Sequence, residues 1–236
     1  MENAGYTTLS RQSGLAREMQ IVANNIANMA TTGFRAEGLI FSEFVKPLEQ
    51  DASLSMGQGN LRQTSFVQGA LTKTGGTFDL AIEGDGYFLI QTPAGERLTR
   101  AGAFSPSAEG DLVTPDGFPV LDAGGAPIFA PPGVVIAISP DGTISAGGTP
   151  LGQIGIVRPV EANSMIREDG VMFDAQSGFE PAETARVLQG FIENSNVNAV
   201  GQLARMIEVQ RAYELGQSFL ETEDERIRSA LKSLST

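Results

Sequence analysis

The sequence predicts an α+β fold, in which a central all-β domain, a sandwich or open barrel, lies between long N- and C-terminal heptad helices that pair as a coiled coil. All 12 Pro and 24 of the 28 Gly lie between residues 33 and 190, whereas both ends repeat apolar residues with heptad spacing. We therefore expect an N-terminal helix at 1–34, an extended connector at 35–74, the β domain at 75–190 and a C-terminal helix at 191–236.

The N-terminal helix is expected over residues 3–30, which would make it roughly 40 Å long at about 1.5 Å per residue. Its large apolar residues are spaced alternately four and three apart, as in a coiled-coil seam, at Leu15, Met19, Val22, Ile26 and Met29. Gly33 stands where a left-handed residue would end the helix. An apolar seam of this length needs a partner, and none is close in the sequence.

The C-terminal helix is expected over about residues 197–234, with Asn196 or Asn198 as its N-cap. An apolar residue recurs at every seventh position, at Met206, Tyr213, Leu220, Ile227 and Leu234. The second seam position is mixed, with Leu203, Gln210, Gln217, Asp224 and Leu231. This disfavours a plain two-stranded zipper, and we expect polar contacts to set the register. The residues expected to meet the first seam are Leu203, Met206, Tyr213, Leu220 and Ile227.

The middle of the chain predicts short strands, because apolar runs alternate with turn dipeptides. These dipeptides are Asp85-Gly86, Gly110-Asp111, Asp116-Gly117, Gly124-Gly125 and Asp141-Gly142. Residues 78–90 predict a hairpin with one buried face, and 134–138 and 154–157 predict buried strands. Residues 45–74 carry few large apolar side chains and are expected to form an extended, mobile connector.

Composition excludes several functions. The chain has no His, Cys or Trp, so the common metal ligands, the thiol nucleophile and the imidazole base are missing, and we expect no catalytic residue, metal or cofactor. A formal charge of −12 would repel a phosphate backbone, which excludes nucleic acid as a partner. The longest aliphatic run, Val134 to Ile138, is too short for membrane insertion, and the start MENAGYTTLSRQSGLAREMQ lacks the features of a cleaved signal peptide.

The segment ANNIANMATTGFR, residues 23–35, places three Asn in a helix with good apolar spacing, although Asn is unfavourable inside helices. Taken alone, Asn28 and Gly33 are explained equally well as a simple helix terminus. The segment also closely resembles the N-terminal motif of the flagellar rod and hook protein family, at Asn24, Asn25, Ile26, Ala27, Asn28, Thr32, Gly33 and Phe34.

Two further segments carry the same resemblance, in the order typical of that family. Residues 74–104, TGGTFDLAIEGDGYFLIQTPAGERLTRAGAF, are similar to its central β domain, and residues 195–219, SNVNAVGQLARMIEVQRAYELGQSF, are similar to its C-terminal helix. The short length and the ending MIEVQRAYELGQSFLETEDERIRSAL most resemble the proximal-rod members, with a distal-rod or hook subunit as the alternative.

The resemblance implies a structural subunit of the flagellar basal-body rod, located in the periplasm and exported by the flagellar type III apparatus without a cleaved signal. Its implied partners are that apparatus and the other proximal and distal rod subunits. A long amphipathic helix is marginal alone. We therefore expect the terminal arms to become ordered on assembly, when their seams meet within and between subunits.

Two rival functions belong to other classes. Asp79, Glu83 and Asp85 could serve as the acid and base of a glycan hydrolase. However, Asp85 stands between two Gly, as turn residues do, and Asp79 and Glu83 share the polar face of one strand. A carbohydrate-binding β module would explain the middle of the chain but would leave both heptad arms without a purpose.

Overall fold

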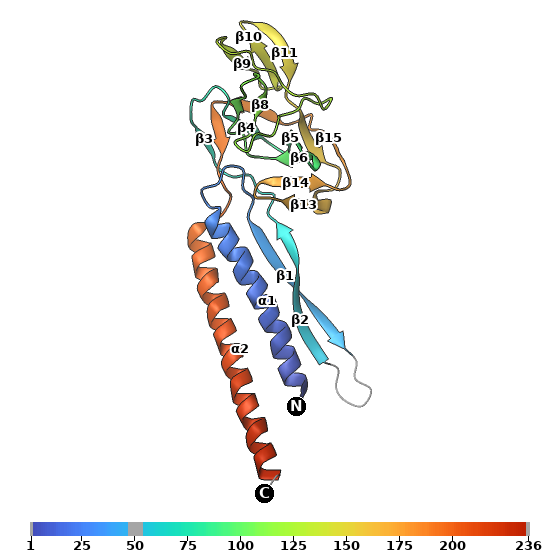
Figure 1. The fold of residues 1–236 in the computed structure, drawn as a ribbon, viewed down its shortest axis with the longest axis vertical. Helices are drawn as coiled ribbons and strands as arrows, with labels where there is room; N and C mark the ends of the chain where they lie inside the picture. Colours follow the sequence, from blue (N-terminus) through green and yellow to red (C-terminus); the bar gives the residue numbers. More distant parts are fainter. Residues whose placement is uncertain (1, 47–53, 235–236) are drawn as a thin grey trace. The chain divides into compact units, whose positions relative to one another are not determined.

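The computed structural model describes residues 2–46 and 54–234, which form two compact units (Figure 1). The helical unit comprises Met1–Met29, Ala36–Phe66 and Val197–Thr236, and the β unit comprises Ala30–Arg35 and Val67–Asn196. Long terminal helices in contact with each other and a β domain of several sheets confirm the α+β class. None of the described helices is both long enough and apolar enough to cross a membrane.

The helical unit contains four elements: helix α1 (Glu2–Ala27), strands β1 (Glu37–Lys46) and β2 (Leu54–Thr64), and helix α2 (Ala199–Leu234). The two helices run in opposite directions side by side, and α1 also packs on the β1–β2 pair (Figure 1). Asn198 caps α2, since its Oδ1 accepts a hydrogen bond of 3.0 Å from the amide of Gly201. This confirms one of the two expected caps.

The segment expected to be an extended connector instead contains an antiparallel pair of strands, in which Glu37 lies opposite Thr64 and Lys46 opposite Leu54. Residues 47–53 lie outside the described residues. The contact of this pair with α1 combines the ring of Phe41 with glycines, and the glycines carry no apolar side chain that a sequence pattern could report. A Cβ on Gly14 of α1 would fall 2.7 Å from the ring of Phe41, and one on Gly59 of β2 would fall 3.2 Å from the Cα of Gly14.

The β unit is antiparallel throughout its described ladders. Its largest sheet has six strands in the order β13-β14-β6-β5-β12-β15, a three-stranded sheet has the order β11-β10-β9, and β16-β4, β17-β3 and β7-β8 form pairs. The first eight strands are β3 (Leu71–Lys73), β4 (Leu80–Glu83), β5 (Tyr87–Thr92), β6 (Gly95–Thr99), β7 (Ser105–Pro106), β8 (Leu112–Val113), β9 (Ile136–Ile138) and β10 (Thr143–Ala146). The others are β11 (Thr149–Gln153), β12 (Ile156–Pro159), β13 (Met165–Glu168), β14 (Met172–Ala175), β15 (Phe179–Pro181), β16 (Arg186–Gln189) and β17 (Phe191–Glu193), with a 3-10 turn at Ala162–Ser164.

The hairpin expected within residues 78–90 does not form. Strand β4 pairs with β16, more than a hundred residues later, whereas β5 pairs with β6 and β12. Both faces of β5 are buried, because Phe88 and Ile90 belong to one apolar cluster and Tyr87 and Leu89 to another. The expected strands at 134–138 and 154–157 begin two residues later than predicted, and Val135 is exposed.

Helix α1 ends at Ala27, before the expected residue 30, and Gly33 does not cap it. Gly33 has the positive φ of 70° expected for a left-handed residue, but its amide donates a hydrogen bond of 2.8 Å to the carbonyl oxygen of Glu193. A Cβ at this position would fall 2.2 Å from the amide nitrogen of Ala101. Glycine is therefore required here by close packing inside the β unit.

Candidate assembly interface

Asn25 of α1 is completely buried and joins three elements of the helical unit. Its Nδ2 donates a hydrogen bond of 2.7 Å to the carbonyl oxygen of Glu37, and its Oδ1 accepts one of 2.9 Å from the amide of the same residue. The Nδ2 also lies 3.3 Å from Oε1 of Gln202 in α2. A carboxamide can pair with both backbone groups of one residue because it carries a donor and an acceptor side by side, as the backbone of a neighbouring strand does.

The other two Asn residues of the same motif contact each other. The Nδ2 of Asn28 donates hydrogen bonds to the carbonyl oxygen of Asn24 at 2.9 Å and to its Oδ1 at 3.0 Å. These contacts occupy acceptors at the end of α1, where backbone carbonyls lose their helical partners. Ala27 is exposed and Ile26 is half-buried. The motif thus combines one Asn that holds the tertiary structure and two that finish the helix.

The second half of the motif belongs to the β unit. Thr32 is half-buried and Phe34 is almost fully buried. The guanidinium of Arg167 lies 4.6 Å from the centre of the Phe34 ring and 4.8 Å from that of Phe173. A planar cation stacked between two aromatic rings fixes residue 34 against the six-stranded sheet.

A buried ionic cluster adjoins this contact. The carboxylate of Glu193 lies 2.8 Å from the guanidinium of Arg35 and 3.1 Å from that of Arg100, and all three side chains are almost fully buried. Glu193 also accepts a hydrogen bond of 3.0 Å from the amide of Gly69. Burial lowers the pKa of Arg35, because a buried cation loses its hydration, while the nearby Glu193 opposes that shift. Burial likewise raises the pKa of Tyr87, which the charge of Arg100 opposes.

The cluster holds together three chain segments that enter or leave the β unit, at residues 33–35, 67–69 and 193–196. The amide of Asn196 donates to the carbonyl oxygen of Phe34 at 3.3 Å, and its side-chain Nδ2 donates to that of Val67 at 2.7 Å. Sequence reasoning quoted Arg35 but missed Glu193 and Arg100. In the sequence, Glu193 and Arg100 stand out only as charged residues within apolar strand regions. Such a position does not indicate which residue of opposite charge will pair with them.

Side chains of the first seam lie at different depths in the helical unit. Leu15 and Val22 are buried, Met19 and Ile26 are half-buried, and Met29 is exposed. Ile21 is also buried, although it lies outside the predicted seam. The reason is that α1 has two covered faces, one towards α2 and one towards the strand pair, whereas a seam accounts for one.

The seam of α2 follows a different second position from the one predicted. Val209 is 1% exposed, whereas Gln210 and Gln217 are exposed. The buried and half-buried positions of α2 include Met206, Val209, Tyr213, Gly216 and Leu220, which are spaced three, four, three and four apart. Leu203 and Ile227 are exposed on the isolated chain.

Polar contacts set the register between the two helices. The carboxylate of Glu18 lies 2.6 Å from the guanidinium of Arg205, and the Nε2 of Gln12 donates a hydrogen bond of 3.3 Å to the carbonyl oxygen of Tyr213. Gln12 packs over Gly216, where a Cβ would come within 3.2 Å of it. A glycine in the interior of α2 is therefore placed where the helices approach each other.

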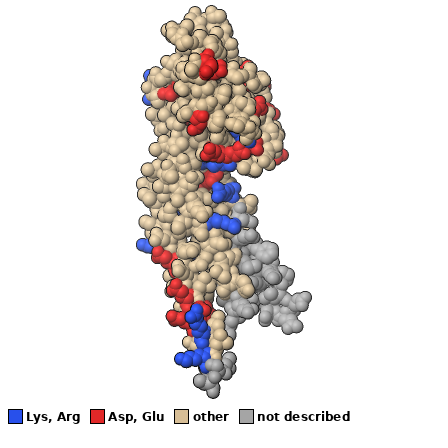
Figure 2. Space-filling model, viewed as in Figure 1, with Lys and Arg blue, Asp and Glu red and all other residues tan. Residues whose placement is uncertain are grey.

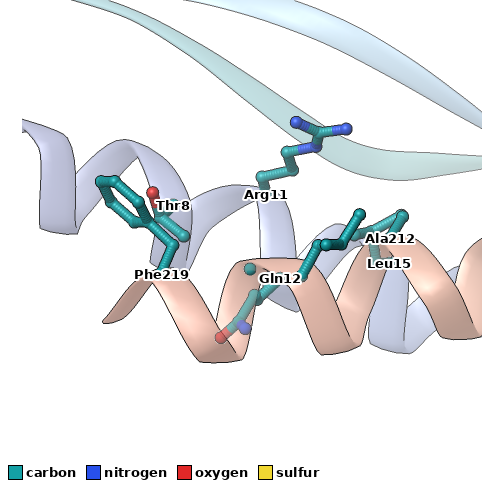
Figure 3. A pocket seen from close by; sticks show the side chains of 8 residues that line it. Thr8, Arg11, Gln12, Leu15, Ala212 and Phe219 are labelled. Atoms are coloured by element: carbon teal, nitrogen blue, oxygen red, sulfur yellow. The ribbon is translucent and has the colours of Figure 1, made fainter. Parts of the chain in front are cut away.

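The helices leave a groove of about 290 Å³ along one side of their contact, shown in Figure 3. Phe219 and Thr8 lie near one end and Leu15 and Ala212 near the other, while the Arg11 side chain extends away from α2. Leu215 in its wall is 73% exposed. The groove holds a single charged residue and no carboxylate, so it offers an apolar contact surface rather than acid–base chemistry.

Further apolar side chains are exposed elsewhere on the helical unit. Val200 is 78% exposed and lies on one face of α2 with Leu203 and Ile207, since these residues are three and four apart. Ile40, Phe41 and Leu61 are exposed on the strand pair. Soluble monomers rarely expose a large contiguous apolar surface, and such surfaces usually mark interaction sites.

The carboxylates of the hydrolase hypothesis occupy ordinary strand and turn positions. Asp79 accepts a hydrogen bond of 2.6 Å from the hydroxyl of Thr74, Glu83 lies opposite Arg186 in the β4–β16 ladder, and Asp85 is exposed between two glycines. Within the described residues, no group of three or more acidic side chains is arranged to hold a metal ion.

Comparison with known proteins agrees with this architecture. The family model "Flagella basal body rod protein" matches residues 6–35, "Flagellar hook protein FlgE/F/G D1 domain" matches 81–146, and "Flagellar basal body rod FlgEFG protein C-terminal" matches 188–233. Flagellar basal-body rod protein FlgF of Caulobacter vibrioides is 41% identical, covering 99% of this chain and 98% of its own. FlgF of Mesorhizobium japonicum is 36% identical, covering 100% of this chain and 99% of its own. FlgG of Bacillus subtilis is 32% identical, covering 93% of this chain and 94% of its own.

The fold and the comparisons together define the class of protein: a structural protein with long terminal helices that pack against each other beside a β domain of several sheets. The chain belongs to the flagellar basal-body rod protein family. Among its relatives it resembles those named FlgF over their full length.

Proposed function

We propose that the chain is a FlgF-type subunit of the proximal rod, where it polymerises through its helical unit with other rod subunits and forms part of the drive shaft. The supporting observation is the apolar surface that the helical unit leaves exposed, above all Leu215 and Phe219 beside the groove and Val200, Leu203 and Ile207 on α2. A contact of this kind joins different surfaces of successive copies, so it propagates into a tube instead of closing.

Burial of these side chains supplies the free energy of assembly. Removing one Leu, Ile, Val or Phe side chain from water contributes roughly 1.5–3 kcal/mol. Ordering a residue costs about 1–2 kcal/mol of conformational entropy, which offsets much of that gain when the terminal arms are loose before assembly. Net assembly therefore requires several neighbours at once, and this requirement keeps single copies from polymerising early.

Export through the flagellar type III apparatus requires a chain that can be unfolded and refolded. The absence of Cys suits this route, because no disulfide has to be reduced or re-formed on the way to the periplasm. Both arms leave the β unit beside the Arg35–Glu193–Arg100 cluster. Within the β unit, the cluster therefore holds together the chain segments that continue into the two arms.

The test is a full-length chain with Leu215→Glu and Phe219→Glu, made in a motile strain in place of the native chain. We expect the variant to be absent from purified basal bodies and the cells to be non-motile, because two carboxylates would be buried at the contact. Val135→Glu, at an exposed apolar residue of the β unit, is the matched control and should leave motility intact. Normal motility of the double variant would refute the proposal.

A further inference from the structure

Residues 30–35, which we call the strap, follow helix α1 and precede strand β1, yet they belong to the β unit. None of them lies in a helix or a strand. Three successive strap residues form backbone hydrogen bonds with distant parts of the β unit: the amide of Gly33 donates to the carbonyl oxygen of Glu193 at 2.8 Å, the carbonyl oxygen of Phe34 accepts from the amide of Asn196 at 3.3 Å, and that of Arg35 accepts from the guanidinium of Arg167. The β unit therefore holds the strap as a binding domain holds a peptide.

The strap and its partners are the parts of the β unit that adjoin the two terminal helices in the chain. Met29 is the last residue of the helical unit before the strap, and Val197 is the first after residues 193–196. Two of the three backbone hydrogen bonds join the strap to residues 193–196. Within the β unit, these bonds connect the segment that follows α1 directly to the segment that precedes α2.

The strap is separate from the apolar core of the β unit. Phe34 belongs to neither of the two apolar clusters, and its ring packs instead against the guanidinium of Arg167, 4.6 Å away. Opening the strap would break its hydrogen bonds, this stacking contact and the ion pair of Arg35, but it would leave the packing of both clusters in place. A segment held in this way can open locally, at a lower free energy than global unfolding.

Buried charge couples the strap to residues 193–196. Acidic side chains of the β unit are visible on its surface in Figure 2, whereas Glu193 is 1% exposed and is the only acidic side chain buried among the described residues of this unit. Arg35 of the strap and Arg100 both pair with it. Removing one partner of a buried ionic cluster is costly, so a closed strap favours residues 193–196 in place and an open strap loosens them.

We propose that the strap is a conformational switch, which opens while both apolar clusters stay folded and releases residues 193–196 at the same time. A closed strap fixes the starting points of both terminal arms on the β unit. An open strap frees both starting points together, so the arms can rearrange without unfolding of the β unit. The use of this switch, with loose arms before assembly and fixed arms after it, rests on the proposed function.

Hydrogen exchange of the purified full-length chain in low concentrations of urea tests the local opening. The amides of Gly33 and Asn196 report on the strap, and the amide of Leu89, which donates to the carbonyl oxygen of Gly155 at 3.2 Å, reports on the core. After correction for intrinsic rates, we expect the two strap amides to exchange about tenfold or more faster than Leu89. Their exchange should also be nearly independent of urea, because local opening exposes little surface. The same urea dependence at all three amides would overturn the proposal.

A core substitution separates local opening from global unfolding. Ile144 is fully buried in the apolar cluster that contains Phe88. Ile144→Val should accelerate exchange at Leu89 roughly fivefold, because it lowers the free energy of global unfolding. Exchange at Gly33 and Asn196 should not change, since the cluster is still folded when the strap is open. Equal acceleration at all three amides would show that the strap opens only by global unfolding, and this would overturn the proposal.

Arg167→Gln tests the coupling, because Arg167 stacks on Phe34 and donates to the carbonyl oxygen of Arg35. We expect exchange to accelerate by the same factor, roughly tenfold, at Gly33 and at Asn196, although Asn196 lies outside the strap. Acceleration at Gly33 alone would overturn the proposal. Phe34→Leu, which keeps an apolar side chain and removes the ring, gives the same readout if Arg167→Gln does not fold.

Arg158→Gln is the control for loss of an arginine, since Arg158 forms an exposed pair with Glu180, and it should leave exchange at Gly33 and Asn196 unchanged. Acceleration by this control equal to that by Arg167→Gln would overturn the assignment of the effect to the strap. All these measurements use the purified chain and need no assembled rod. Absence of the unaltered chain from basal bodies would therefore refute the proposed function and not the switch.

Discussion

The side-chain amide of Asn25 forms two hydrogen bonds with the backbone of a single residue, Glu37, so that a helix side chain takes the place of a neighbouring strand. The pair connects the end of α1 with the start of β1, and Gln202 extends the contact to α2. Removing the amide would leave a buried N–H and a buried C=O without partners, and each such group is costly.

Asn25→Ala should therefore lower the free energy of unfolding by roughly 2–4 kcal/mol. Asn28→Ala, which removes contacts at an exposed helix end, should cost only about 0.5–1 kcal/mol. Urea unfolding of both variants, followed by the helical circular dichroism signal, measures the difference. Equal losses of unfolding free energy in the two variants would show that the hydrogen bonds to Glu37 do not contribute more than the contacts of Asn28.

Glu193→Gln should destabilise the β unit by roughly 3–5 kcal/mol, because it leaves the buried cations of Arg35 and Arg100 without an anion. Glu180→Gln is the matched control, since Glu180 forms an exposed pair with Arg158 and its loss should cost less than about 1 kcal/mol. Thermal unfolding of the two variants compares them directly. A loss for Glu193→Gln no greater than that of the control contradicts this account.

Gly33→Ala should be far more damaging than Gly117→Ala, although both glycines have positive φ values, of 70° and 84°. A Cβ on Gly33 would collide with the backbone of Ala101, whereas one on Gly117 would meet nothing within 4 Å. We expect Gly117→Ala to cost about 1 kcal/mol through backbone strain alone. Soluble yield and the unfolding midpoint should be measured for both variants. A similar loss in the two variants would mean that backbone strain alone explains both and that the collision at Gly33 does not occur.

Gly14→Ala and Gly201→Ala should have opposite effects in the two helices. Ala at Gly14 would place its Cβ 2.7 Å from Phe41 and push α1 away from the strand pair. Gly201 is exposed, and a Cβ built on it would come no closer than 3.4 Å to any neighbouring atom. Ala there should therefore stabilise α2 by up to about 1 kcal/mol through helix propensity. Urea unfolding midpoints measure both. Stabilisation by Gly14→Ala would show that the close approach is not required.

The carboxyl group of Glu168 should titrate below its ordinary value, because hydrogen bonding to Arg97 at 2.6 Å lowers its pKa. A pKa that is lower in the folded than in the unfolded chain contributes stability above the ordinary pKa of 4.5, and this contribution is lost as the pH falls through the folded pKa. NMR titration of the carboxyl carbon should show the shift, and Arg97→Gln should return the midpoint towards 4.5. An unchanged midpoint in that variant would exclude Arg97 as the cause.

Local patterns were sufficient for the helices. Heptad spacing predicted both terminal helices, and Asn198 was one of two caps proposed for α2. The same spacing did not reveal that Ile21 would be buried or that Val209 would occupy the second seam position. A periodic pattern reports which residues share a face, but it does not report how many faces of a helix are covered.

Strand pairing was less accessible from sequence. Strand β4 was expected beside β5, its nearest neighbour along the chain, but it pairs with β16. The strand pair β1–β2 was missed because β2 approaches α1 at Gly59, which has no side chain to signal burial. Both errors concern contacts whose strength depends on groups distant in the sequence.

The sequence by itself determined the positions of the helices and the all-β character of the middle, because each depends on residues within a few turns or one strand of one another. Only the tertiary structure decided which strands pair, that Glu193 neutralises Arg35 and Arg100, and that Asn25 serves β1. Those contacts join residues far apart in the chain, and burial alone makes them strong, since a charge or an amide removed from water must find its partner inside the protein.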